Sequence, residues 1–241
     1  PEGTPEGVDL VAYGEADTLL SDAEFRDAVE RELAAQGVGS TLSDLLDGIE
    51  RTTGIDPRRV GTTTGFGAAT EYGAVIFEAD ADPEGIRASL AAAGVLLDES
   101  EYEGYDLYTV GSDEFAREFV LCDLGGGEFA VGARHEIEGV IDIRRGNRPG
   151  LDNTLATAVE SATAGELRFG FLLPENLFTV LGLPEGLSQL IDLGEFEYGY
   201  GAVVDGELTV TIRAVSSDAA GDLASQLTSI SRILAASGET N

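Results

Sequence analysis

Hydrophobic positions recur along this chain at two spacings, one typical of helices and one typical of strands. Apolar residues three or four positions apart predict amphipathic helices, and Gly37, Gly54 and Gly94 are placed to end three of them. Thr41 and Asp44 have the spacing of a capping box at the start of the second helix. The predicted helices cover 22–36, 42–53, 83–93, 136–143, 152–163 and the region from residue 217 onward, with helical or turn-like stretches at 174–181 and 187–193.

Stretches rich in Val, Ile, Thr, Phe and Tyr predict short strands between these helices. Asp205-Gly206 separates the last two and is a strong hairpin signal. The order of elements predicts an α+β fold with mostly antiparallel sheet or sheets and helices packed on one face. The predicted strands cover 8–13, 60–69, 72–79, 105–110, 118–123, 128–133, 166–172, 196–204 and 207–215.

The order strand, helices, hairpin, helix occurs twice along the chain. Gly65-Phe66-Gly67-Ala68 and Gly199-Tyr200-Gly201-Ala202 take the same place in the two hairpins. We therefore expect an internal duplication, and the two copies either share one sheet or face each other across a cleft. The expected division is a linker at 1–7, a first repeat with an extra hairpin at 8–150, a second repeat at 151–237 and a tail at 238–241.

The charge balance predicts the solvent more clearly than the function. The chain has 45 acidic residues, 14 arginines, no lysine and a net charge of −31, while 43% of its residues are hydrophobic. This composition is typical of proteins from extremely halophilic archaea, because concentrated salt screens the repulsion of like charges. We interpret the acids as a solvated coat that binds salt cations non-specifically. A nucleic-acid partner is excluded, since its phosphates would be repelled.

Candidate chemistry is sparse. Cys122 is the only cysteine and His135 the only histidine, and no nucleophile or phosphate-loop motif is present. Glu78, Asp80 and Asp82 alternate like the start of a calcium loop, but the glycine and distal glutamate of that loop are missing. They are weak metal candidates. The acidic stretch 98–103 is interpreted as a loop.

Two further groups are candidates for binding. Arg144, Arg145 and Arg148 form a basic spot in an acidic chain and predict an anion or partner site. A ligand groove between the two repeats is the second candidate. Its expected lining residues are Phe169, Phe171, Tyr198 and Tyr200.

Several short motifs together carry a resemblance. They are Thr53-Gly54-Ile55-Asp56-Pro57, Tyr102-Glu103-Gly104-Tyr105-Asp106-Leu107-Tyr108, Gly127-Glu128-Phe129-Ala130-Val131-Gly132 and Ile137-Glu138-Gly139-Val140-Ile141-Asp142. In this order the motifs resemble a family of extracytoplasmic or lipid-anchored envelope proteins that is defined only as a domain of unknown function. The resemblance spans about residues 8–215. It implies an interaction role outside the cytoplasm and supplies no catalytic residues and no cofactor.

We therefore expect a halophilic, non-enzymatic protein that is secreted or lipid-anchored and that binds an unknown macromolecule or assembles at the cell surface. The chain has no methionine and no apolar run of membrane-spanning length. We therefore expect either a processed product, from which a signal or anchor segment has been removed, or an excised piece of a longer protein. A cytoplasmic location stays open. A carrier of an apolar small molecule and a carboxylate-dependent enzyme are the alternative functions.

Overall fold

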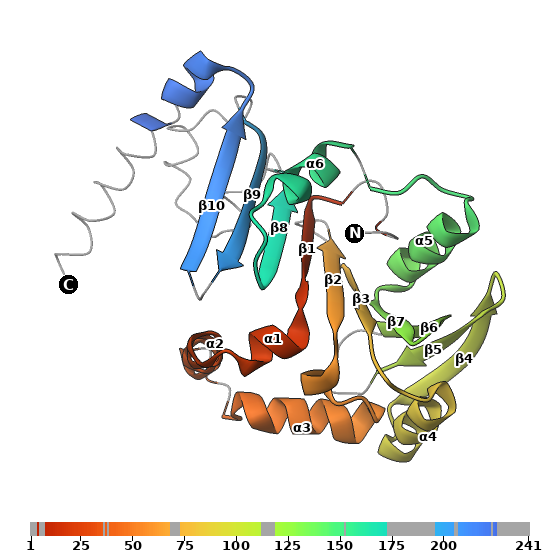
Figure 1. Ribbon diagram of the computed structural model, residues 1–241. Helices are drawn as coiled ribbons and strands as arrows, with labels where there is room; N and C mark the ends of the chain where they lie inside the picture. The colour runs from red at the N-terminus through yellow and green to blue at the C-terminus, as the bar shows by residue number, and fades with distance from the viewer. Residues whose placement is uncertain are drawn as a thin grey trace.

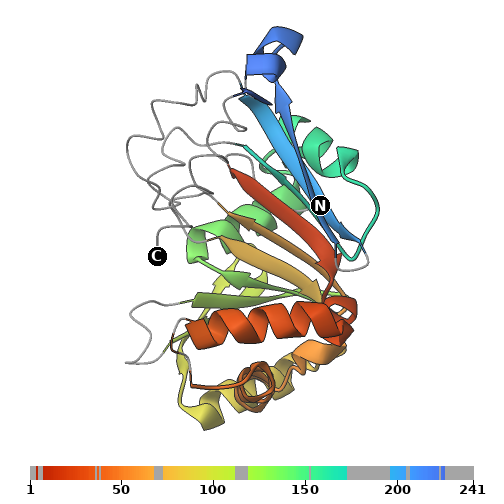
Figure 2. The ribbon, with the colours of Figure 1, turned by 90° about the vertical axis from the view of Figure 1, so that its left-hand side faces the viewer.

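The strands of this protein form one continuous antiparallel sheet. The computed structural model describes residues 4, 8–35, 37, 39–67, 73–111, 119–151, 153–172, 196–204, 207–222 and 224–225. The ten strands have the order β10-β9-β8-β1-β2-β3-β7-β6-β5-β4, and Figures 1 and 2 show them as one twisted layer. Their bounds are β1 Leu10–Glu15, β2 Thr62–Gly67, β3 Ala74–Glu78, β4 Leu96–Tyr102, β5 Tyr105–Val110, β6 Phe119–Gly125, β7 Glu128–Gly132, β8 Leu167–Phe171, β9 Phe196–Val204 and β10 Glu207–Ala214.

The α+β class and the antiparallel sheet confirm the prediction from the hydrophobic pattern. The helices are α1 Ala16–Ser21, α2 Ala23–Ala35, α3 Leu42–Thr53, α4 Pro83–Ala93, α5 Arg134–Arg145 and α6 Asn153–Ser161, with a 3₁₀ turn, η1, at Pro57–Arg59. Residues 217–222 are also helical. The predicted stretches at 174–181 and 187–193 lie outside the described residues.

Local end signals placed α3 and α4 correctly. The Thr41 side chain accepts a hydrogen bond from the Asp44 amide, and the Asp44 carboxylate accepts one from the Thr41 amide, which completes the capping box. The carboxylate of Asp82 accepts a hydrogen bond from the amide of Gly85 at the start of α4. Gly54 and Gly94 end the two helices in the left-handed conformation, which glycine adopts without strain.

Helices cover both faces of the sheet, which corrects the expectation of a single covered face. Neighbouring residues of one strand point to opposite faces. Ile76 packs in a core cluster with residues of α5 and α6, whereas the adjacent Phe77 packs in a second cluster with Ile86 and Leu90 of α4. We call these the α5/α6 face and the α4 face. Figure 1 shows α1 to α4 grouped together, away from α5 and α6.

Two elements escaped prediction because their sequences show no clear hydrophobic period. The stretch 98–103, interpreted as a loop, lies mainly in the edge strand β4, whose acidic side chains are largely exposed. The short helix α1 has no buried residue and therefore shows little hydrophobic period. The helix α5 is also longer at both ends than the predicted 136–143.

Strands from both predicted repeats share the sheet rather than facing each other across a cleft. Strands β8 and β1, third and fourth in the sheet order, pair antiparallel where the two halves of the chain meet. From there β2 and β3 extend from β1 to one side, and β9 and β10 extend from β8 to the other. The Gly-x-Gly pair of β2 faces β1, and the corresponding pair of β9 faces β8. The duplication itself stays a prediction.

Candidate functional site

An apolar cavity lies between the α4 face of the sheet and the helices α1 and α3. Its volume is about 380 Å³, and none of its lining side chains is charged. The floor comes from β2, β3, β5, β6 and β7, and the roof comes from α1, α3, η1 and α4. The lining residues are Thr63, Val75, Phe77, Val110, Leu121 and Val131 in the floor, and Ala16, Leu20, Ile49, Thr53, Ile55, Pro57, Val60 and Leu90 in the roof. We call this space the α3 cavity.

The cavity exists because α3 does not reach the sheet. Leu42, Leu45, Leu46 and Ile49 give the helix one apolar side, which normally packs into a core. No residue of α3 is buried, and Ile49 remains 47% exposed although it lines the cavity. Val75 of the floor is 36% exposed. Two apolar surfaces therefore face each other without filling the space between them, and the space is open to solvent.

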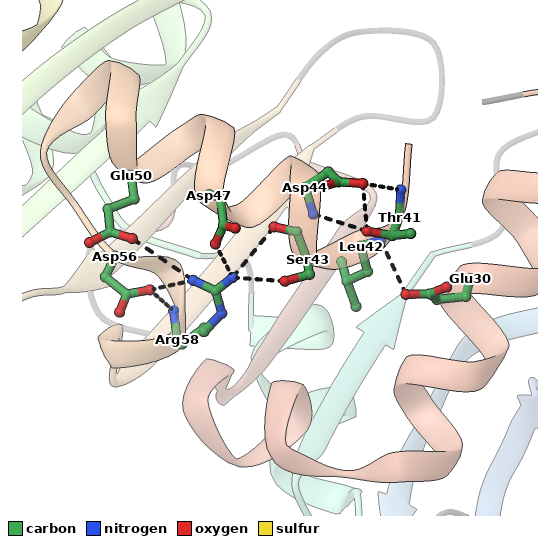
Figure 3. Close-up of polar contacts among 9 residues, drawn as sticks. All are labelled: Glu30, Thr41, Leu42, Ser43, Asp44, Asp47, Glu50, Asp56 and Arg58. Carbon is green, nitrogen blue, oxygen red and sulfur yellow. Dashed lines mark hydrogen bonds and ion pairs between the residues drawn. The ribbon is translucent and has the colours of Figure 1, made fainter. Parts of the chain in front are cut away.

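Arg58 fastens α3 to the turn η1 on the outside of the cavity (Figure 3). Its guanidinium binds the carboxylate of Asp47 on α3, contacts Glu50 at 3.9 Å and donates to Asp56 at 3.3 Å. The nitrogen that binds Asp47, Nη2, also donates to the backbone carbonyl of Ser43 at 3.4 Å. The hydrogen bond to Asp47 raises the pKa of Arg58 above its ordinary value. We call this contact set the Arg58 latch.

The N-terminal end of α3 has further polar anchors. The amide of Leu42 donates to Oε1 of Glu30 on α2 at 3.3 Å, which links the two helices (Figure 3). In the capping box, the hydrogen bond from the Thr41 hydroxyl lowers the pKa of Asp44, and the bond from the Thr41 amide lowers it further. Polar contacts in its first half and middle thus position α3, while none of its residues is buried.

The four aromatic residues expected to line one groove lie on opposite faces of the sheet. The rings of Phe169 and Phe171 stack with centroids 6.2 Å apart and cover Gly201 and Gly199 of the neighbouring strand. Alternation directs Tyr198 and Tyr200 to the other face. There Tyr198 belongs to the α5/α6 core and Tyr200 packs against it. The structure therefore does not bring the four together, and none of them lines the α3 cavity.

Two of the three arginines expected to form an anion site, Arg144 and Arg145, have different neighbours. Arg144 lies 2.5 Å from Oε1 of Glu128. Arg145 donates to the carbonyl of Glu103 and lies over the ring of Tyr105, 5.2 Å from its centroid. Arg144 and Arg145 occupy the last turn of α5, where a positive charge interacts favourably with the helix dipole. These intramolecular contacts give Arg144 and Arg145 structural roles without an external anion.

The three weak metal candidates, Glu78, Asp80 and Asp82, have different structural surroundings. Asp82 caps α4, and Asp80 is 97% exposed with Arg59 3.9 Å away. Glu78 ends β3. Among the residues that the structure describes, no group of three or more His, Cys, Asp or Glu side chains is arranged to hold a metal ion.

Cys122 and His135 show no sign of acting together. The Cys122 thiol is buried in the α5/α6 core, and burial raises its pKa to about 12. A nucleophilic cysteine instead needs a lowered pKa. His135 is mainly exposed, and its Nε2 lies 3.4 Å from Oε1 of Glu136. The thiol is therefore protonated in the folded protein at neutral pH.

Within the described part of the chain, no helix combines the length and the apolar character needed to cross a bilayer.

Sequence reasoning placed a ligand groove among aromatic residues of the second half, whereas the apolar cavity of the described structure is lined by residues of the first half. The available signal was α3, whose four apolar residues on one side predict close packing. Only the tertiary structure shows whether another part of the chain packs against the apolar side of α3. The floor residues Val75, Val110 and Val131 come from three strands that are distant in the sequence.

Comparison with known proteins supports the fold alone. No family model matches the chain, and no curated protein matches it. Crystal form IV of TP0453 is similar with a TM-score of 0.52 and 12% identity, over 88% of this chain and 78% of that chain. Crystal form III of TP0453 gives 0.49 and 11%, over 83% and 72%. The resemblance to an envelope family stays a prediction.

Proposed function

We propose that this protein is a non-enzymatic binding protein that holds an uncharged, hydrocarbon-rich ligand in the α3 cavity. The observation that carries the proposal is the unfilled apolar space between the roof, to which α3 contributes Ile49 and Thr53, and the floor around Val75. Apolar groups left in contact with water lose the favourable free energy of burial. A ligand that fills the space recovers it.

The size of the cavity suits a small organic molecule. A volume of about 380 Å³ exceeds the ~150 Å³ cavity that takes up benzene. It falls within the range of about 300–1,000 Å³ that is usual for ligand pockets. Side chains from both sheet and helices surround the space, so a ligand would be held on several sides.

The chemistry of the lining selects an uncharged ligand. Thr53 and Thr63 supply the hydroxyl groups, and the other lining residues are apolar. A charge buried there without a partner would lose its hydration at a large cost. The net charge of −31 also repels anions from the surface. These features favour a neutral hydrocarbon over a fatty-acid anion, and they offer no acid–base pair for an enzyme.

A cavity-filling substitution tests the proposal. In Val75→Trp the indole would occupy the floor of the cavity, so binding of an uncharged apolar dye such as Nile red should be largely lost. The sequence contains no tryptophan, so the new indole also reports whether it lies in an apolar environment. Val215→Trp is the matched control, because Val215 is 59% exposed and lies outside the cavity.

Equal dye binding by the two folded variants and the wild type would contradict the proposal. An anionic naphthalene dye serves as a second probe and should bind more weakly than the neutral one. Circular dichroism of all three proteins shows that they are folded.

A further inference from the structure

We propose that the edge strand β10 is a self-complementary interface that pairs antiparallel with β10 of a second copy of this chain. The strand is the last in the sheet order and has β9 as its strand neighbour in the described structure. Its backbone groups on the other side form a template for a further strand. This inference is independent of the proposed ligand, because β10 contributes no residue to the α3 cavity.

The two edges of the sheet differ in charge. Edge strand β4 carries Asp98, Glu99 and Glu101, so a second copy paired there would bring carboxylates together. Strand β10 has one acid, Glu207, and one base, Arg213, at opposite ends of the segment 207–213. In a chain of net charge −31, this edge lacks the charges that protect the other one.

The sequence of β10 reads symmetrically about Val210. If two copies pair antiparallel with Val210 opposite Val210, Glu207 of each copy lies opposite Arg213 of the other. In the same register Thr209 lies opposite Thr211. Opposite charges and threonine pairs are both favourable between facing residues of antiparallel strands. A twofold axis through the Val210 pair makes the interface identical for both copies.

The backbone hydrogen-bond pattern allows this register. Val204 and Glu207 are paired and three positions apart, the spacing at which the ends of a β-turn share a backbone hydrogen bond. In an antiparallel ladder the backbone N–H and C=O groups of successive residues point to alternate sides. The groups of residues 207, 209, 211 and 213 therefore point toward β9. The groups of residues 208, 210 and 212 then point toward the edge that no described strand covers. With Val210 at the centre, each of these residues meets another whose groups also point outward.

The side chains of this segment are accessible to a second copy. Val210 is 48% exposed, and Thr209, Thr211 and Arg213 are also exposed. Arg213 donates from Nε to Oε2 of Glu197 at 3.2 Å, and its other nitrogens can reach a second carboxylate. A single pair of strands buries less than about 1,200 Å², so we expect a weak dimer that depends on concentration. Salt near 1 M should favour it by screening the net charge.

Cysteine crosslinking of the full chain tests the register directly. In Val210→Cys the two sulfurs would lie across the twofold axis, where Cα atoms about 5.5 Å apart suit a disulfide. Mild oxidation should give a covalent dimer. Val215→Cys, which is exposed beyond the end of β10, is the control and should crosslink much less. The native Cys122 is buried and should not interfere.

Charge exchange identifies the partner residues. Glu207→Arg and Arg213→Glu should each raise the dimer dissociation constant by about tenfold or more, because like charges then face each other. A mixture of the two variants restores opposite charges at both ends and should recover association. Sedimentation at several concentrations measures each case, and circular dichroism checks the fold.

Recovery in the mixture, together with the Val210→Cys crosslink, would establish this interface. A protein that stays monomeric at all concentrations would overturn it. So would a dimer that neither charge variant weakens, because such a dimer would use another surface.

Discussion

Gly199 shows at the scale of one residue how aromatic rings are used in this fold. The ring of Phe171 lies where a side chain on Gly199 would be, and Phe169 has the same relation to Gly201. An aromatic ring that covers a glycine on the neighbouring strand buries apolar surface without a ligand. The aromatic pattern of the second half is therefore explained by packing.

We predict that Gly199→Ala destabilises the protein because its new methyl group overlaps the Phe171 ring. Overpacking of this kind typically costs about 1–3 kcal/mol of unfolding free energy. Gly65→Ala is the matched control, since the added Cβ would meet only Val75 Cγ2, at 4.0 Å. Denaturant unfolding of both variants measures the difference. Equal stability of the two would show that the ring moves aside freely.

Cys122 gives a prediction on thiol reactivity and pH. Burial raises its pKa from 9.0 to about 12, so the folded protein should resist thiol reagents at pH 8 and react only as it unfolds. Above pH 9 the thiol ionises in the unfolded chain but not in the folded one, which disfavours folding as the pH rises toward 12. Alkylation rates with and without denaturant test this. Rapid labelling of the folded protein would contradict it.

At the scale of elements, α3 depends on polar contacts rather than on packing. Most helices gain their stability from a buried apolar side. No residue of α3 is buried, and its Ile49 and Thr53 line a cavity, so the capping box and the Arg58 latch hold the helix in place. Because it lacks packing against the sheet, α3 is also the element best placed to move in response to the proposed ligand.

We predict that Arg58→Ala loosens α3 and speeds exchange of an apolar dye. The substitution removes the contacts to Asp47 and Asp56, so amides of 42–53 should exchange hydrogen faster. Arg59→Ala is the matched control, because neighbouring Arg59 is largely exposed and reaches Asp80 only at 3.9 Å. Hydrogen-exchange mass spectrometry compares the two. If α3 exchanges equally in both variants, the latch does not hold the helix.

The whole molecule combines a strongly acidic composition with few compensating cations. With 45 acids against 14 arginines, the carboxylates repel one another across the surface. The described ion pairs join only a fraction of these acids, and most of them are partly or largely exposed. Such pairs stabilise a fold little. We therefore propose that the fold depends on concentrated salt.

We predict that raising KCl from about 0.1 M to about 1 M increases the thermal unfolding midpoint, because the Debye length falls from about 10 Å to about 3 Å. Thermal unfolding followed by circular dichroism measures the change. A chloride series at constant ionic strength separates screening from binding of a particular cation. An unchanged midpoint across the series of concentrations would show that the acidic coat is not an adaptation to brine.

The sequence by itself determined the elements whose signals are local. The capping box at Thr41, the Asp82 and Pro83 start of α4 and the Asp205-Gly206 hairpin each involve residues close together in the chain. The sequence also determined the α+β class and the excess of acidic residues, because strand alternation, helical spacing and composition can be read directly along the chain. These features needed no long-range information.

Only the tertiary structure decided which apolar surfaces meet. It joined both halves into one sheet, placed Phe171 and Tyr198 on opposite faces, and left α3 standing away from Val75. The physical reason is that burial is a non-local quantity. The hydrophobic pattern marks which side of an element avoids water, but packing between distant segments decides whether that side is filled, and a cavity is what remains where it is not.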